Sequence, residues 1–120
     1  MPHLHLLTNV SQDSFTDGFI SETSKLLAQT LGKPESYCCF TVQQVHGAFG
    51  GSNKKFGSAR LMSIGCLGVK ENQKHSATLS KHFEKHLGIP SDRLYFEFVD
   101  AKPADVGYNG TTFHAIFGGH

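Results

Sequence analysis

Pro2 is the residue of this sequence best placed to do chemistry, because it directly follows the initiator Met1. If Met1 is removed, Pro2 carries a free secondary amine at the head of a strand-like stretch, residues 3–10. An apolar pocket and a neighbouring cation both disfavour the charged form of such an amine, and the pyrrolidine ring fixes its direction. We therefore interpret Pro2 as a candidate general base. A proline that only marks the start of a strand is the structural alternative.

Histidines and cysteines are the other residue types that could do chemistry. His3 and His5 share one face of the predicted strand, and His82 and His86 lie one helical turn apart. Neither pair has a carboxylate or cysteine partner at a recognisable metal-ligand spacing, which favours half-exposed positions over a zinc site. The odd number of cysteines argues against a disulfide framework and favours buried thiols. The cysteines are Cys38, Cys39 and Cys66, with no C-x-x-C pair.

Length and charge narrow the classes of function. The chain has 120 residues, of which 38% are hydrophobic, enough for one compact domain. Its formal charge of +1 creates no extended field that would favour nucleic acid or an anionic membrane. No stretch approaches the roughly 20 apolar residues of a membrane span, and the N-terminus lacks the basic and apolar regions of a signal peptide. We therefore expect synthesis in the cytosol and no membrane insertion.

Two amphipathic helices are predicted to position these residues. The first covers about residues 14–31, with Ser14 and Asp17 placed to cap its start, and the second covers about residues 71–87. Their apolar faces comprise Phe15, Phe19, Leu26, Leu27 and Leu31 in the first helix, and Leu79, Phe83 and Leu87 in the second. A glycine followed two residues later by a proline ends each helix.

The matching helix ends belong to an internal repeat. An apolar run follows each end, at residues 37–42 and 94–99, and residues 3–8 align with residues 59–64. Each half, about 1–58 and 59–114, is therefore predicted as strand, helix, strand. Crossover helices imply parallel pairing within each half, so the two halves joined edge to edge predict an α/β fold. It has a four-stranded mixed sheet with both helices on one face.

The other face of this sheet has no helix left to cover it. An exposed apolar sheet face predicts assembly with other copies of the chain. The remaining segments, residues 43–58 and 102–120, are rich in glycine and aromatic residues. Short strands there could pair with neighbouring subunits. The C-terminal extension, residues 115–120, either adds a strand at such an interface or frays.

Short motifs in a fixed order resemble those of one known family. They are Met1-Pro2, Thr8-Asn9-Val10, Asp17-Gly18-Phe19, Gly32-Lys33-Pro34, Ala48-Phe49-Gly50-Gly51-Ser52, Ser63-Ile64-Gly65, Asp92-Arg93, Val106-Gly107-Tyr108-Asn109 and Thr112-Phe113. Each motif is weak alone, but their spacing over about residues 1–114 is specific. The chain resembles the macrophage migration inhibitory factor (MIF) family of the tautomerase superfamily. The resemblance implies a homotrimer whose sheets surround a central channel, with active sites at subunit interfaces.

The resemblance also implies roles for individual residues. Pro2 matches the catalytic base of the family, and Lys33 matches a pocket lysine that would lower the proton affinity of the amine and bind a substrate carboxylate. Without the resemblance, Lys33 would be a helix-terminal lysine that favours the helix dipole. Ile64 matches the residue whose backbone N–H faces the substrate. The family's pocket walls correspond to four residues of this chain: Tyr95, from the adjacent subunit, Val106, Tyr108 and Phe113. For Tyr95 and Phe113, packing in the core or at an interface is a compatible alternative.

The chemistry that the resemblance implies is keto–enol tautomerisation without a cofactor. The neutral nitrogen of Pro2 would remove a proton from the carbon next to a ketone and return it at another position. Lys33 and the N–H of Ile64 would stabilise the developing enolate, and each well-placed donor contributes roughly 3 kcal/mol to lowering the barrier. An aromatic 2-keto acid such as phenylpyruvate, or a dopachrome-like compound, would fit an apolar pocket with one cation.

Several positions depart from the mammalian cytokine of the family. Glu97 replaces an asparagine at the pocket rim, where an ionised carboxylate would repel an anionic substrate or engage Lys33; a solvated strand residue is the alternative. Tyr108 replaces a tryptophan and keeps an aromatic wall. Phe56 and Ala59 occupy the places of a C-x-x-C motif, so no thiol–disulfide oxidoreductase activity is expected.

Two classes of function stay open at the level of sequence. The favoured one is a phenylpyruvate or dopachrome tautomerase that is also a cytokine-like ligand. The alternative is a receptor-binding protein with vestigial enzyme activity. Its receptor would be a cell-surface protein such as the class II invariant chain. Gln12 replaces a receptor-mimicking arginine of the mammalian cytokine. The resemblance implies a protein that is cytoplasmic and is also secreted by a non-classical route.

Overall fold

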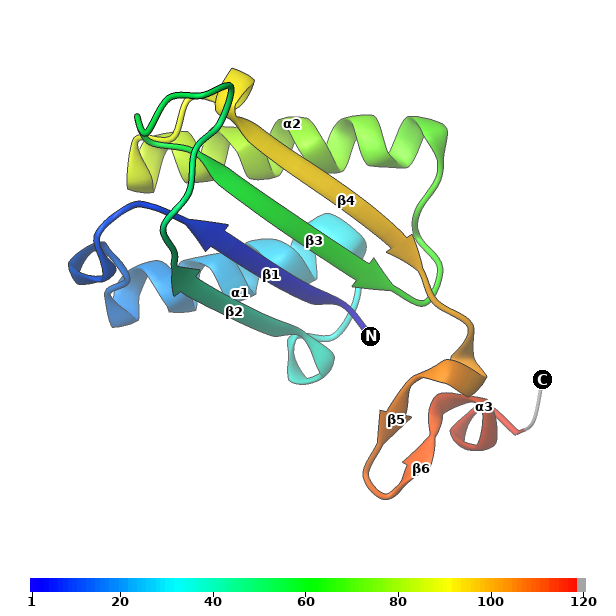
Figure 1. The fold of residues 1–120 in the computed structure, drawn as a ribbon. Helices are drawn as coiled ribbons and strands as arrows, with labels where there is room; N and C mark the ends of the chain where they lie inside the picture. Colours follow the sequence, from blue (N-terminus) through cyan, green and yellow to red (C-terminus); the bar gives the residue numbers. More distant parts are fainter. Residues whose placement is uncertain (119–120) are drawn as a thin grey trace.

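A mixed sheet with helices on one face forms the body of the molecule, as predicted (Figure 1). The computed structural model describes residues 1–118. The strands of the main sheet are β1 (His3–Thr8), β2 (Cys39–Gln44), β3 (Gly57–Ser63) and β4 (Leu94–Asp100), and the long helices are α1 (Asp17–Leu31) and α2 (Val69–Leu87). The strand order is β2-β1-β3-β4. Strands β1 and β2 are parallel, as are β3 and β4, whereas β1 and β3 are antiparallel.

Alternation along β1 decides which side chains face the helices. Leu4 and Leu6 are fully buried in the core, whereas His3 and His5 are half-buried on the opposite face. The core between the sheet and the helices comprises Leu4, Leu6, Val10, Phe19, Leu27, Leu31, Ala59, Leu61, Leu79, Phe83, Leu87, Ile89 and Leu94. The helix faces predicted from periodicity therefore pack against one side of the sheet, and the other side carries none of the helices in Figure 1.

The predicted start of the first helix was wrong, whereas both predicted ends are confirmed. Ser14 lies in a separate short turn, η1 (Gln12–Ser14), and the side chain of Thr16 caps α1 by accepting a hydrogen bond from the Phe19 N–H. Asp17 is the first helical residue rather than the cap. Helix α1 ends at Gly32 and α2 at Gly88, both with positive φ, a conformation that glycine adopts without steric cost.

The C-terminal segment pairs with itself within the chain. Strands β5 (Gly107–Tyr108) and β6 (Thr111–Thr112) form an antiparallel hairpin whose turn residues both have positive φ. The last element is not a strand but the helical turn α3 (Phe113–Ile116), capped by Thr112. The prediction of an added strand is therefore wrong for residues 115 and 116, and residues 119–120 of the predicted extension lie outside the described part. In Figure 1 this hairpin and α3 project beyond the end of β4.

Candidate functional site

A cavity of about 180 Å³ lies where the N-terminus meets the C-terminal hairpin. Its walls come from the head of β1, from β2 and β3, from the short turn η2 (Glu35–Tyr37) and from the segment that includes β5 and the start of α3. The residues that line it are Met1, Pro2, His3, Tyr37, Cys39, Met62, Val106, Gly107, Tyr108 and Phe113. The fold therefore brings four of the predicted site residues together: Pro2, Val106, Tyr108 and Phe113.

Pro2 is fixed at this cavity by the sheet. It is almost fully buried, and its carbonyl accepts a hydrogen bond of 2.9 Å from the Cys39 N–H on β2. Partial burial, and next the charge of Lys33, lower the pKa of the α-amino group of Met1, one residue further out. An amine created at Pro2 by removal of Met1 would sit deeper in the same surroundings. The site is thus suited to hold an uncharged amine that accepts protons.

Lys33 lies next to the cavity rather than in its wall. It follows the left-handed Gly32, and its backbone N–H donates to the Ala28 carbonyl, which fixes it at the end of α1. Its Nζ donates to the Ile64 carbonyl at 3.4 Å, on the loop that leads from β3 to α2. Because the charge of Lys33 acts on the N-terminal amine, the three predicted residues Pro2, Lys33 and Ile64 belong to one electrostatic neighbourhood.

Aromatic rings form the apolar wall of the cavity. Tyr108 stacks on Phe113 with 5.3 Å between ring centroids, and Tyr37 meets Tyr108 edge-on at 5.4 Å and Phe113 at 6.0 Å. Phe113 is buried, whereas Tyr37 and Tyr108 are partly exposed at the cavity mouth. Such a wall has the shape and apolar character that suit a flat aromatic group.

Several wall residues were missed at the level of sequence. His3 is opposite Cys39 on β2 and opposite Met62 on β3, so these residues surround Pro2 through the register of the sheet. The repeat predicts which strands pair but does not fix the register. Tyr37 was placed inside a predicted strand, whereas it ends the turn η2 and its ring meets the C-terminal hairpin.

Tyr95 and Glu97 do not reach the cavity within one chain. Tyr95 is level with Leu7 across β3, a position about 17 Å along β1 from Pro2. Its ring, 69% exposed, contacts the ring of Phe49 at 4.9 Å between centroids. Glu97 pairs with Arg60 at 2.6 Å rather than with Lys33, and its side chain is 62% exposed, in line with the alternative of a solvated strand residue. Both side chains lie away from the Pro2 cavity because β4 is separated from β1 by β3.

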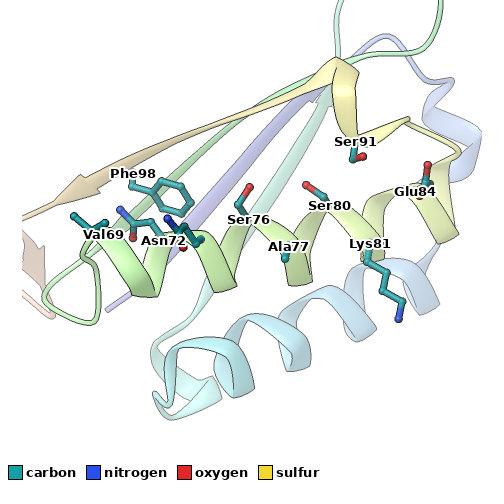
Figure 2. A pocket seen from close by; sticks show the side chains of 10 residues that line it. Val69, Asn72, Ser76, Ala77, Ser80, Lys81, Glu84, Ser91 and Phe98 are labelled. Carbon is teal, nitrogen blue, oxygen red and sulfur yellow. The ribbon is translucent and has the colours of Figure 1, made fainter.

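A larger cavity, of about 680 Å³, lies elsewhere in the described part of the chain. It runs along α2 beside Phe98 of β4 and Ser91 of the turn η3 (Ser91–Arg93), as Figure 2 shows. Its remaining lining includes Ser76, Ser80, Lys81 and Glu84, and none of the predicted site residues borders it. Volume alone therefore does not identify the site.

His82, His86 and two of the three cysteines lie away from the Pro2 cavity. His82 and His86 are half-buried between the two helices, as predicted, and residues 1–118 contain no group of three histidine, cysteine or acidic residues that could hold a metal ion. The prediction of buried thiols was wrong for Cys39 and Cys66, which are exposed. Cys39 lies on the open face of β2, an edge strand, and Cys66 occupies a left-handed turn at φ 64°.

Comparison with known proteins places this geometry in a family. The family model described as "Macrophage migration inhibitory factor (MIF)" matches residues 1–114. The chain belongs to this family. A MIF homologue of Trichuris trichiura is 44% identical over 116 residues, which cover 94% of this chain and 100% of that protein. MIF of Xenopus tropicalis is 38% identical over 94% of this chain and 99% of its own length.

The solved structures agree with this assignment to the MIF family. The structure of MIF from Trichinella spiralis superposes with a TM-score of 0.89 at 39% identity, over 92% of this chain and 99% of that one. A MIF homologue from Prochlorococcus marinus gives a TM-score of 0.88 at 33% identity, over 92% of this chain and 98% of that one. The mixed sheet with its helices is therefore the MIF tautomerase fold. No helix within residues 1–118 is long and apolar enough to cross a membrane.

Proposed function

We propose that the protein, after removal of Met1, is a keto–enol tautomerase that uses the Pro2 nitrogen as its general base. The observation that carries the proposal is the buried position of Pro2 in an aromatic-walled cavity. There, burial and Lys33 disfavour a charged amine. Family membership supports an isomerase type of reaction.

The reaction follows from the chemistry of this cavity. The lone pair of the Pro2 nitrogen takes a proton from the carbon beside a ketone, and the C–H electron pair forms the C=C bond of the enol while charge moves to oxygen. Lys33 and the backbone N–H of Ile64 are the proposed donors toward that oxygen. In the reverse direction the protonated amine returns the proton to carbon.

The walls of the cavity support an aromatic 2-keto acid such as phenylpyruvate, or a dopachrome-like compound, as substrate. The rings of Tyr37, Tyr108 and Phe113 suit a flat aromatic group, and Lys33 suits a carboxylate. Val106 adds apolar lining. A mostly apolar site with one cation selects this class over a neutral polar substrate.

We further propose that the working unit is a homotrimer. The sheet face opposite the helices carries Tyr95 at 69% exposure beside an open cavity that Phe49 also lines, an apolar surface that a neighbouring copy would cover. In such an assembly Tyr95 and Glu97 of one subunit would border the Pro2 cavity of the next. The catalytic site would then be complete only between subunits.

A second proposed role is that of a cytokine-like ligand. The observation that favours it is the name of the relatives, which are macrophage migration inhibitory factors or their homologues. The proposed partner is a cell-surface receptor such as the class II invariant chain, reached by a protein that is cytoplasmic and is also secreted by a non-classical route. Binding would depend on the outer surface of the trimer rather than on turnover.

The proposed function is tested by a phenylpyruvate tautomerase assay. Mass spectrometry first establishes that Met1 is absent, because retained methionine leaves Pro2 as a non-basic amide. Pro2→Gly is expected to lose about 100-fold or more of kcat, and receptor binding is measured on the same variant. Full activity of Pro2→Gly would reject the base. Strong receptor binding by an inactive Pro2→Gly protein would separate signalling from turnover.

A further inference from the structure

Two histidines of β1 connect two different cavities. His3 lines the Pro2 cavity, and His5 lines a second cavity, of about 340 Å³, on the open face of the sheet. Because alternate residues of a strand point to the same side, both rings lie on the face opposite the helices. Thr41 of β2 lies directly opposite His5 in the register. These residues form a row along the sheet from one cavity to the other.

One hydroxyl bridges the two imidazole rings. The Oγ1 of Thr41 lies 3.0 Å from Nε2 of His3 and is also within hydrogen-bond distance of Nδ1 of His5. A threonine hydroxyl has one proton to donate, so it donates to one ring and accepts from the other. The row therefore has a direction, and moving one proton along it reverses that direction. A chain of this kind can conduct protons between its ends.

The groups around His3 keep it uncharged and free to exchange protons. Burial, and next the charge of His5, lower the pKa of His3. Cys39 and Met62 flank His3 on the neighbouring strands. Arg60 is opposite His5 and is bound to Glu97 of β4, so its charge is already paired. Neutral imidazole has one donor and one acceptor nitrogen, which is the form that a relay requires.

We propose that His3, Thr41 and His5 form a proton relay between the Pro2 cavity and the cavity on the open sheet face. The relay supplies and removes the proton on the substrate oxygen in the tautomerase reaction. This inference rests on the proposed function. It gives the reaction two proton carriers, the Pro2 nitrogen for carbon and His3 for oxygen.

Each proton of the relay is accounted for. When Pro2 has taken the carbon proton, the enolate oxygen takes the Nδ1 proton of His3, whose Nε2 takes the hydroxyl proton of Thr41. The Thr41 oxygen takes the Nδ1 proton of His5, and the Nε2 of His5 takes a proton from hydronium in the second cavity. The Pro2 proton leaves to solvent. The reverse reaction runs the same steps backwards, so the histidines switch tautomer and neither gains a net charge.

The direct test removes the bridging hydroxyl. Thr41→Val keeps the shape of an exposed strand residue, and we expect it to lower kcat about 10-fold with little change in KM. Thr41→Ser, which restores a hydroxyl, is expected to recover most of that loss. Thr78→Val, the same exchange on an exposed position of α2, serves as the matched control. If Thr41→Val fails to fold, His5→Gln interrupts the relay at its far end.

Solvent deuterium separates a relay from a structural effect. The dependence of kcat on the deuterium fraction is expected to be curved in the native protein, because several protons move together, and linear in Thr41→Val. Nitrogen-15 NMR should show altered tautomers of both His3 and His5 in that variant. Unchanged kcat and linear plots in all forms, beside an inactive Pro2→Gly, would overturn the relay and leave the proposed function intact. An inactive native protein lacking Met1 would overturn both.

Discussion

Single residues decide whether the amine at the head of β1 is a base. Pro2 is buried and anchored to β2, and the lowered pKa of the neighbouring Met1 amine shows how the site treats a positive charge. The nearness of Pro2, Val106, Tyr108 and Phe113 could be predicted from sequence because family motifs carry them. His3, Cys39 and Met62 could not, because their nearness to Pro2 depends on strand register.

Lys33 is expected to keep the Pro2 amine uncharged at neutral pH. Its charge lowers the pKa of the N-terminal amine, so Lys33→Ala should raise the pKa of the Pro2 amine and leave less of the neutral base at pH 7. We expect kcat/KM to fall about 10- to 100-fold at neutral pH and less at alkaline pH, where the amine is neutral in both forms. Steady-state kinetics over a pH series measure this.

The matched control for Lys33 is Lys25→Ala, which removes an exposed charge from α1, the helix that Lys33 follows. Lys25→Ala should not change the dependence of kcat/KM on pH. An equal loss of rate at every pH in Lys33→Ala would show that Lys33 binds substrate but does not tune the base.

Whole elements form where local signals and packing agree. Both helix ends were predictable because glycine alone adopts the left-handed conformation cheaply at Gly32 and Gly88. The start of α1 was not, since Ser14, Thr16 and Asp17 are all good capping types and only the path of the chain selects Thr16. Short strands were expected in the C-terminal segment, but their pairing with each other as the β5–β6 hairpin was missed, because two-residue strands carry no pattern that selects a partner.

The capping assignment yields a stability prediction. Thr16→Ala should lower the free energy of unfolding by about 1 kcal/mol, because the Phe19 N–H loses its acceptor. Ser14→Ala should change it by a few tenths at most, since Ser14 does not cap the helix. Denaturant unfolding of both variants measures the difference. If Ser14→Ala lowered the free energy of unfolding more than Thr16→Ala does, Ser14 rather than Thr16 would be the cap of α1.

The contact between α1 and α2 predicts loss of stability in acid. Burial, and next the charge of His86, lower the pKa of His82 to about 4. The hydroxyl of Thr23 donates to the Phe19 carbonyl, so it accepts the N–H of neutral His82 at 2.8 Å. The unfolded chain therefore binds a proton at higher pH than the folded one, and stability present above about pH 6.5 falls as pH drops toward 4.

We expect the free energy of unfolding to fall by about 1–2 kcal/mol as His82 becomes protonated in acid, since solvent screens a half-buried ring. Unfolding free energies at pH 7 and pH 4.5 test it, with His82→Gln expected to be less sensitive to pH. His46→Gln, an exposed loop histidine, is the control and should behave as the native protein. If the unfolding free energy of His82→Gln depended on pH as strongly as that of the native protein, groups other than His82 would cause the acid sensitivity.

The molecule as a whole leaves one face of its sheet open, and this face makes the trimer testable. The internal repeat made the four-stranded mixed sheet predictable, but it did not fix the strand order. Tyr95 and Glu97 lie far from Pro2 within one chain. The expected place of Tyr95 in the pocket of an adjacent subunit, and of Glu97 at the pocket rim, therefore depends on the trimer. Light scattering should give three times the mass of one chain.

Mixed trimers of Pro2→Gly and Tyr95→Ala provide the sharper test. Each variant alone is expected to be impaired. Mixed assemblies should regain activity, because about a quarter of their sites combine a native Pro2 with a native Tyr95 from the next subunit. Mixtures no more active than the sum of the separate variants would show that Tyr95 does not complete a neighbouring site.

The Pro2 nitrogen is expected to be neutral when it acts as the base. Nitrogen-15 NMR titration of the protein without Met1 measures this directly. We predict a pKa below the ordinary range of α-amino groups, about 7.7–8.0. A nitrogen that titrates within or above that range would be cationic at neutral pH and would contradict the account.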